Sequence, residues 1–505
     1  MILASVEQTP PAAETAPAIP DDVLAKLRAA AGRVDVELVA RGSAEVAGQT
    51  ASFTLRLAAD GRSDWQVKAA AGYRIVDGGA CAWSLDSAGP VRVLELEELD
   101  LARLWIALLG GRWLERGAPF RVTPDAARST GERLVFDVEI SGGVRRGELE
   151  VDGASFHPLS FTIGSRVGEQ RWTFSDWTAF EGRAFPRAFE RRDGTATESF
   201  RVTALEPAPA DARAFAEPAA PALGTRWVEG AAALVRLKRA PSGHLVFHPR
   251  LEGEDLGAFV LDSGAAVTIL RRDIADELGM ERFGSLRLGG VGQSSIASAF
   301  RRGAALDLGP LVLSDLVYFE GVVPGLAEAV GEPIAGILGY DLFARAIVEL
   351  DSDAPSIALH EPAHYARPEL DWQPLSLYGR HPHVEAGFEQ RERGLFRFDT
   401  GMGGLALLLH APTVERLHLL AGRETREIEI GGAGGATNAR LGKVASFELG
   451  KWSLAEPTTV FAESTGDAGD DPYSLGTFGP PLLKGLVAVF DYPGRRVAFF
   501  EHERR

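Results

Sequence analysis

The sequence predicts a mainly β protein, in which a curved antiparallel sheet is followed by a duplicated, two-lobed β-barrel unit. Three observations predict this class. Gly 57 and Pro 29 in 505 residues indicate many turns. Short alternating apolar and polar segments, separated by Asp-Gly and Gly-Gly turns, run from Val34 to about Val202. A series of landmarks then occurs twice, in the same order, in the rest of the chain.

The composition excludes several classes of function. A net charge of -17 argues against a nucleic-acid partner, because phosphate binding needs clustered Lys and Arg. The single cysteine, Cys81, excludes an intrachain disulfide and a Cys-based metal cluster, and we expect no metal and no cofactor. No segment reaches the roughly 18 consecutive apolar residues that a membrane span requires.

The chain begins with residues 1–20, which are rich in Pro, Ala, Thr and Glu and are expected to form a disordered lead-in. Met1–Val6 is too short for a signal-peptide core and lacks a basic leader. It could be the remainder of a trimmed signal sequence. A periplasmic or exported location is therefore slightly favoured, and a cytoplasmic one stays open.

Residues 21–205 are expected to form the curved β-sheet domain. A short helix is predicted directly after Pro20, and a second one around Leu99–Leu109, where apolar residues recur at helical spacing. Segments such as Ala51–Leu57 and Arg133–Ile140 alternate as strands do. The tryptophans of this domain favour the core over a ligand cage: Trp65, Trp83, Trp172 and Trp177.

A Pro/Ala-rich linker over residues 206–225 separates this domain from two further lobes, residues 226–365 and 366–505. Each lobe contains an apolar strand that ends in an Asp-Ser/Thr-Gly turn, and the two turns are 399 − 262 = 137 residues apart. Other landmarks follow at offsets of 133 to 142: His248-Pro249 with His381-Pro382, Leu286–Gly292 with Ile428–Gly434, Ala305–Gly309 with Ser446–Gly450, Gly336–Leu342 with Gly476–Leu482, and Ile347–Asp351 with Val487–Asp491. Such a duplication predicts two lobes related by an approximate two-fold axis, which would bring the equivalent turns together.

This order of turn, Gly-rich hairpin and apolar-apolar-Gly segment resembles the aspartic proteases, pepsin-like and retroviral, over roughly residues 228–505. The resemblance implies that Asp262 and Asp399 are catalytic. It further implies that Ser263, Gly264, Thr400 and Gly401 hold the two turns together. The implied flap over the substrate contains Gly290, Val291, Gly292 and Gln293, with Gly432 and Gly434 in its counterpart. The implied partner is a peptide or protein substrate, and two lobes in one chain imply a monomer.

The first domain is similar in element order and Gly-turn placement to the half-barrel of bacterial lipoprotein carriers. That similarity rests on no motif. It leaves binding of an apolar ligand, binding of a partner, and simple packing against the two lobes as alternatives for this domain.

Two adjacent carboxylates can carry out hydrolysis without a metal. They share one proton, so the ionised member can accept a proton from water while the protonated one hydrogen-bonds the scissile carbonyl. A hydroxyl after the turn glycine would favour the charged carboxylate, but Ala265 and Met402 supply none. We therefore expect a pH optimum of about 5–7.

The second lobe departs from the family pattern at several positions. Arg397 replaces an apolar residue, Met402 follows the second turn, and Gly476–Gly479 matches its counterpart poorly. The second lobe could therefore be degenerate. The alternative to an aspartic endopeptidase is a non-catalytic peptide- or lipid/lipoprotein-binding protein built on a degenerate protease fold.

Two further patterns favour ordinary explanations. The Gly-rich hairpins lack the following helix and the Lys-Ser/Thr of a nucleotide-binding loop. Four histidines lie close together in sequence without a metal-binding spacing, and we expect them at the surface: His360, His364, His381 and His383.

Overall fold

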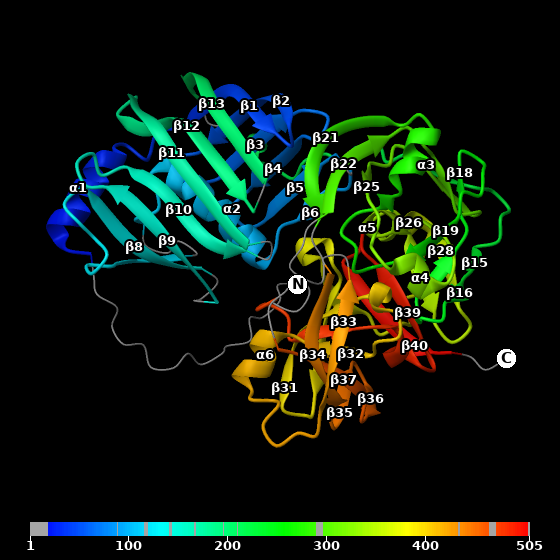
Figure 1. The fold of residues 1–505 in the computed structure, drawn as a ribbon. Helices are drawn as coiled ribbons and strands as arrows, with labels where there is room; N and C mark the ends of the chain where they lie inside the picture. Colours follow the sequence, from blue (N-terminus) through cyan, green and yellow to red (C-terminus); the bar gives the residue numbers. More distant parts are fainter. Residues whose placement is uncertain are drawn as a thin grey trace.

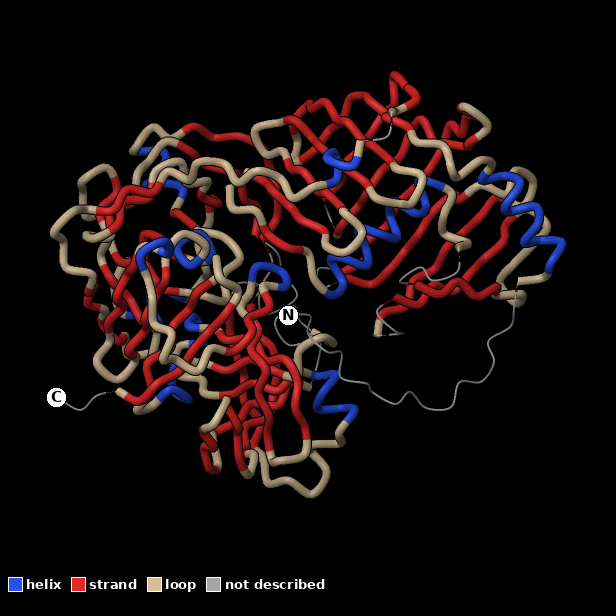
Figure 2. Tube along the Cα trace, turned by 180° about the vertical axis from the view of Figure 1, so that it is seen from behind, coloured by secondary structure: helices blue, strands red, loops and turns tan. Residues whose placement is uncertain are grey.

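The computed structural model describes residues 19–87, 89–115, 120–140, 144–165, 168–194, 196–209, 211–288, 296–432, 435–463 and 471–502. Strands form most of the regular structure, and helices are few and short, as Figure 2 shows from behind. The predicted mainly β class is confirmed. Figure 1 shows three parts: a broad sheet at the N-terminal side, and two smaller β units that follow it.

The first part is one 13-stranded antiparallel sheet with two helices. Its strands follow the order β6-β5-β4-β3-β2-β1-β13-β12-β11-β10-β9-β8-β7, so the first and last strands of the domain pair in the middle. The elements are α1 (Asp21–Ala31), β1 (Leu38–Val46), β2 (Gln49–Leu57), β3 (Ser63–Lys68), β4 (Tyr73–Asp77), β5 (Ala82–Asp86), β6 (Arg92–Val93), α2 (Leu96–Gly110), β7 (Phe120–Pro124), β8 (Arg133–Ile140), β9 (Arg145–Asp152), β10 (Pro158–Ser165), β11 (Gly168–Phe180), β12 (Arg183–Asp193) and β13 (Ala196–Pro207).

Helix α2 supplies much of the core of this domain. Leu104 and Leu108 are four residues apart and therefore lie on one face of the helix, where both are buried against the sheet. The helix ends at Gly110, and Gly111 then adopts a left-handed conformation with φ 71° that closes the last turn. The apolar side of the sheet and the apolar stripe of α2 thus bury each other.

Lobe 1, for which we keep the predicted bounds 226–365, follows the chain segment after β13. Its elements are β15 (Leu234–Arg236), β16 (Lys238–Arg239), β17 (Leu245–Phe247), β18 (Arg250–Leu251), β19 (Ala258–Leu261), β20 (Ile269–Leu270), α3 (Arg272–Glu277), β21 (Glu281–Leu288), β22 (Ile296–Arg302), β23 (Leu306–Asp307), β24 (Leu311–Leu313), β25 (Tyr318–Glu320), α4 (Leu326–Val330), β26 (Ile334–Leu338), α5 (Tyr340–Phe343), β27 (Ile347–Asp351) and β28 (Ser356–His360). The short strand β14 (Thr225–Trp227) pairs with β24 at the boundary.

Lobe 2, for which we keep the predicted bounds 366–505, repeats much of this order over its described residues. Its elements are β29 (Gln373–Ser376), β30 (His383–Phe388), β31 (Glu392–Phe398), β32 (Leu407–Leu409), α6 (Ala411–Arg416), β33 (Arg426–Gly432), β34 (Gly435–Lys443), β35 (Ser446–Leu449), β36 (Trp452–Ala455), β37 (Thr458–Ala462), β38 (Gly476–Phe478), β39 (Leu486–Asp491) and β40 (Arg496–Glu501).

Equivalent strands pair in the same way in the two lobes. The strand before the first Asp turn, β19, is parallel to β26, and β20 is antiparallel to β26. In lobe 2, β31 is parallel to β38, and β32 is antiparallel to β38. The lobes are joined by β27 and β39, which pair antiparallel within one large sheet. Across the described residues the strands of both lobes lie in open sheets, not in the closed barrels that the sequence led us to expect.

The first domain contacts both lobes. The start of α2 is acidic, and Glu95 accepts hydrogen bonds from the Ser376 hydroxyl (2.9 Å) and the Leu377 N–H (2.8 Å) of lobe 2. On lobe 1, the Ser285 N–H in β21 donates to the Ala47 carbonyl at 2.7 Å. The sheet domain therefore contacts the β21–β22 hairpin of lobe 1 and the segment around Ser376 and Leu377 of lobe 2.

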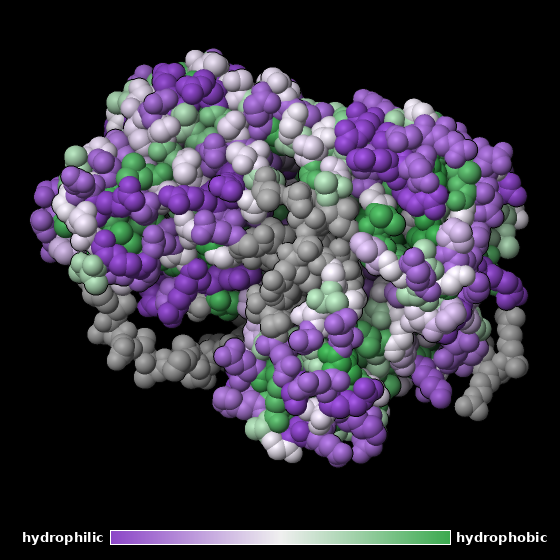
Figure 3. Space-filling model, in the orientation of Figure 1, coloured by the Kyte–Doolittle hydropathy of each residue, from purple (hydrophilic) through white to green (hydrophobic). Residues whose placement is uncertain are grey.

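In the view of Figure 3, hydrophilic side chains cover most of the described surface, and hydrophobic ones show in smaller patches between them. Within the described residues, no helix has both the length and the apolar character to cross a membrane.

Candidate active site

Each aspartate of the two predicted turns follows directly on a buried apolar strand. Asp262 comes after β19, and its N–H donates to the Leu338 carbonyl of β26 at 3.0 Å. Asp399 comes after β31, and its N–H donates to the Phe478 carbonyl of β38 at 2.9 Å. The parallel partner strand therefore fixes where each Asp turn begins, and it does so identically in the two lobes.

Four hydrogen bonds cross between the two turns through the hydroxyls of Ser263 and Thr400. The Ser263 hydroxyl donates to the Phe398 carbonyl at 2.8 Å and accepts from the Thr400 N–H at 3.0 Å. The Thr400 hydroxyl donates to the Leu261 carbonyl at 2.9 Å and accepts from the Ser263 N–H at 2.8 Å. Both side chains are buried, at 0% and 1% exposed, so these bonds are shielded from water. The two turns thus form one reciprocal unit.

The glycine of each turn lies against the carboxylate of the other. A Cβ added to Gly264 would lie 2.3 Å from Cγ of Asp399, and one added to Gly401 would lie 2.3 Å from Cγ of Asp262. Only glycine leaves the space that the opposite carboxylate occupies. Both turns therefore require glycine for close approach, and the approach brings Asp262 and Asp399 together.

The electrostatics of the pair follow from this proximity. Burial raises the pKa of Asp262 well above its ordinary value, and the charge of Asp399 and a hydrogen bond with it raise this pKa further. Two contacts act in the opposite direction, namely the Gly264 N–H, which donates to Asp262 at 2.8 Å, and the charge of Arg397. The arrangement therefore favours one shared proton between the two carboxyl groups.

Behind the first turn, a buried carboxylate holds the chain in place. The Thr268 N–H and hydroxyl both donate to Asp341, at 3.0 and 2.7 Å, and Arg345 pairs with the other oxygen of the same carboxylate at 3.2 Å. The sequence did not predict this role of Asp341. Its only sequence signal is an acidic residue shortly after Gly339, at the start of α5. In lobe 2 the position 140 residues later is Pro481, so the second turn lacks this carboxylate.

Lobe 2 instead contains buried polar side chains near its Asp turn. Arg397 is 8% exposed, and its Nε donates to the Thr477 hydroxyl at 3.3 Å. His410 is fully buried between the same hydroxyl (2.9 Å) and the Ser474 carbonyl (3.0 Å). Arg397 was recognised from the sequence as a departure from the family pattern, but its partners were not. The structure shows that it belongs to a hydrogen-bonded interior.

Two residues that the sequence reading did not select also lie close to the pair. His244, at the turn between β16 and β17, lies near Asp399. Burial lowers the pKa of this histidine, while the charge of Asp399 opposes that shift. Tyr492 follows β39, is 2% exposed, and has its pKa raised by burial, by Tyr340 and by the two aspartates. Neither residue carries a sequence signal, because both reach the site through strand pairing.

The structure corrects two expectations about histidines. The pairing places Val246 opposite Val260 and His383 opposite Arg397, which gives an offset of 383 − 246 = 137. His244 is therefore the counterpart of His381, and His248 is not. His383 is 2% exposed, so it lies in the interior and not at the surface as expected.

The two Gly-rich segments are carried by hairpins. In lobe 1 the hairpin consists of β21 and β22, and in lobe 2 of β33 and β34, where Gly432 pairs with Gly435. Five of the residues predicted for the flap lie outside the described residues: Gly290, Val291, Gly292, Gln293 and Gly434. Among the described residues, no group of three or more His, Cys, Asp or Glu side chains is placed to hold a metal ion.

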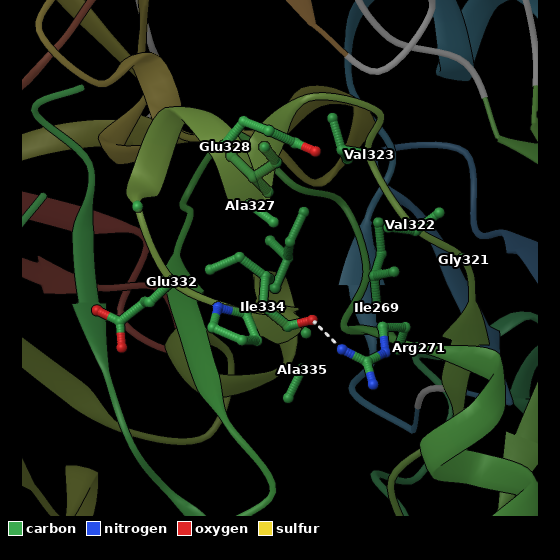
Figure 4. A pocket seen from close by; sticks show the side chains of 15 residues that line it. Ile269, Arg271, Gly321, Val322, Val323, Ala327, Glu328, Glu332, Ile334 and Ala335 are labelled. Carbon is green, nitrogen blue, oxygen red and sulfur yellow. Dashed lines mark hydrogen bonds between the residues drawn. The ribbon is translucent and has the colours of Figure 1, made fainter. Parts of the chain in front are cut away.

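A cavity of about 480 Å³ lies in lobe 1, and residues 334–337 of β26 form part of its wall. Figure 4 shows part of its lining, which includes the apolar side chains of Val322, Val323, Ala327, Ile269 and Ile334. Ile337, which also lines the cavity, pairs with Val260 two residues before Asp262. Arg271 at its edge donates to the Ile334 carbonyl at 3.4 Å. The cavity is therefore mostly apolar, and part of its wall belongs to the strand that pairs with the one leading into the first Asp turn.

Comparison with known protein families gives a match within lobe 1. Residues 249–342 match the family model of aspartyl protease. This segment contains Asp262 and most of the elements that surround it, so this region of the chain is aspartyl protease-like. No curated protein matches the chain.

Three solved structures are similar at low identity. A LolA superfamily protein from Nitrosomonas europaea is 12% identical over 40% of this chain and 98% of that one, with a TM-score of 0.30. Conglutin gamma, a basic 7S globulin from lupine seeds, is 10% identical over 54% of this chain and 95% of that one, with a TM-score of 0.34. A DUF1329 family protein from Desulfovibrio piger is 13% identical over 37% of this chain and 94% of that one, with a TM-score of 0.26.

Proposed function

We propose that this protein is an aspartic endopeptidase that hydrolyses peptide bonds with Asp262, Asp399 and a water molecule. The observation that carries the proposal is the reciprocal packing of each carboxylate on the glycine of the opposite turn. That arrangement supplies two coupled carboxyl groups at one point, which is what this chemistry requires.

The reaction would use the shared proton of the pair. The ionised carboxylate accepts a proton from water as the water oxygen attacks the carbonyl carbon, and the protonated carboxyl group donates a hydrogen bond to the carbonyl oxygen. Collapse of the resulting tetrahedral species transfers a proton to the leaving amine and breaks the C–N bond. No covalent intermediate with the protein is needed.

The cavity of Figure 4 supports a preference for an apolar side chain next to the scissile bond. Its lining consists mainly of Val, Ile, Leu and Ala side chains, and burial of an apolar group there contributes binding energy. The substrate class in this proposal is therefore a peptide or unfolded protein with large apolar residues.

The test is cleavage of a denatured protein mixture by the purified full-length chain and by Asp262→Asn. We expect the variant to lose activity by at least about 10³-fold, since it removes one member of the pair. The matched control is Asp371→Asn, which changes an exposed aspartate outside the site and should leave the rate unchanged. Equal cleavage by wild type and Asp262→Asn would overturn the catalytic proposal and favour the non-catalytic binding protein.

A further inference from the structure

A second cavity of about 480 Å³ lies where the sheet domain meets the two lobes. Its wall includes three indole rings of the sheet domain, those of Trp65, Trp105 and Trp172. Phe300 of β22 and Phe319 of β25, both in lobe 1, complete it. A cavity of this size, lined in part by aromatic rings and located at a domain boundary, has the properties of a small-molecule site.

Four buried polar atoms in this wall have no hydrogen-bond partner among the described residues: Nε1 of Trp65, Nε of Arg92, Oε1 of Gln170 and Nε1 of Trp172. Two of them lie on one strand, namely the indole Nε1 of Trp172, a donor, and Oε1 of Gln170, an acceptor; these side chains are 3% and 9% exposed. Gln170 and Trp172 are two residues apart on β11 and therefore point to the same face of the sheet. Because a buried unpaired donor or acceptor is costly, this pair calls for a ligand group that both accepts and donates.

The charged side chains in the wall do not call for a charged ligand. Each described one forms an ion pair with another residue: Arg191 with Glu198 at 3.0 Å, Arg92 with Glu98 at 2.5 Å, Asp77 with Arg103 at 2.8 Å, and Arg380 with Asp86. An ionic ligand would have to break one of these pairs in a largely apolar enclosure, at a high desolvation cost. The wall thus favours an uncharged ligand.

We propose that this cavity binds an uncharged apolar molecule that carries an amide group. The amide oxygen accepts a hydrogen bond from Trp172, and the amide N–H donates to Gln170. The apolar part of the ligand contacts the indole cluster together with Phe300 and Phe319. Since these last two residues belong to lobe 1, the bound ligand lies between the sheet domain and the protease-like unit. This site is independent of the catalytic pair.

The test measures tryptophan fluorescence of the full-length Asp262→Asn protein, because three of the 9 tryptophans line the cavity. The probes are decanamide and N-acetylphenylalaninamide, which carry a neutral amide on an aliphatic and on a peptidic body. Saturable binding of either probe supports the proposal and indicates the source of the ligand. If neither binds up to its solubility limit, the proposal is overturned.

Methyl decanoate and decanoate serve as matched probes for decanamide. The ester accepts a hydrogen bond but cannot donate one, so it should bind about fivefold to tenfold more weakly than the amide, since Gln170 stays unpaired. Decanoate should bind more weakly than both at pH 8, where it is charged. An ester that binds as tightly as the amide, or a tighter carboxylate, would contradict the proposal.

Variants of β11 separate the two polar contacts. Gln170→Met should weaken the amide about fivefold and leave the ester unchanged, whereas Trp172→Phe should weaken both by a similar factor. Trp177→Phe is the control, because Trp177 is on the same strand but outside the wall and already donates to the Pro158 carbonyl at 3.2 Å. Thermal unfolding checks that each variant is folded. Equal effects of Trp172→Phe and Trp177→Phe would overturn the assignment.

Discussion

Three paired positions on the strands beside the Asp turns are apolar in lobe 1, whereas the equivalent positions of lobe 2 carry a histidine, a cation and a hydroxyl. The residues compared are Val246, Val260 and Ile337 in lobe 1, and His383, Arg397 and Thr477 in lobe 2. All six are buried. The same backbone pairing therefore accommodates apolar side chains in one lobe and polar ones in the other at these three positions.

This difference teaches which contacts the Asp turns need. The hydroxyl bonds between the turns, the two close glycines and the parallel partner strands are the same in both lobes. The side chains behind the turns are not. The cation of Arg397 favours the charged form of the adjacent pair, while lobe 1 offers an apolar cavity. We propose that the two lobes have different roles. Arg397 of lobe 2 favours the charged form of the carboxyl pair, and the cavity of lobe 1 binds an apolar side chain of the substrate.

The largest effect is expected from Asp399→Asn. If lobe 2 is an equal partner in catalysis, this variant loses at least about 10³-fold in cleavage rate, as Asp262→Asn does. The measurement is kcat/KM on one peptide for both variants. A residual rate above roughly a tenth of wild type in Asp399→Asn alone would show that the second lobe is degenerate in function as well as in sequence.

The next prediction concerns stability against pH. The pKa of Asp262 is raised in the folded protein, so its contribution to stability is complete below its ordinary pKa of 3.8 and is lost as pH rises through the raised value. Asparagine cannot ionise. Asp262→Asn should therefore gain free energy of unfolding over wild type at pH 8 and show little difference at pH 3, as measured by urea unfolding. Asp371→Asn serves as control, and a gap of equal size at both pH values would contradict the prediction.

Removing either hydroxyl between the turns should cost about 1–3 kcal/mol of stability, because the partner groups stay buried and lose a hydrogen bond. Ser263→Ala and Thr400→Ala should have similar effects, since each hydroxyl donates one bond and accepts another. Thr400→Ser keeps the hydroxyl and should lose much less. The measurement is the free energy of unfolding in urea at one pH. Strongly unequal losses in the two alanine variants would contradict the prediction that the two hydroxyls contribute equally.

The sequence predicted the Asp turns well because their signals are local. An apolar strand, an aspartate and a glycine occur within a few residues, and the repeat doubled that signal. The interior of lobe 2 could not be predicted, because the cost of burying Arg397 is offset by partners as distant as Thr477, 80 residues away. The same applies to Trp172. Its burial in the core was expected, but the cavity beside it exists only because residues of lobe 1 and lobe 2 complete the wall.

The smallest effect is expected in the cavity of lobe 1. Val323→Ser replaces an apolar side chain in the lining, and it should lower kcat/KM about tenfold for a peptide with a large apolar residue beside the scissile bond. Val323 is half-buried, so the folded structure should tolerate the change, and thermal unfolding checks this. A peptide with alanine at the same position is the control, because a small side chain gains little from the lining. A loss of equal size for both peptides would mean that the cavity does not receive the substrate, and the proposed division between the lobes would then fail.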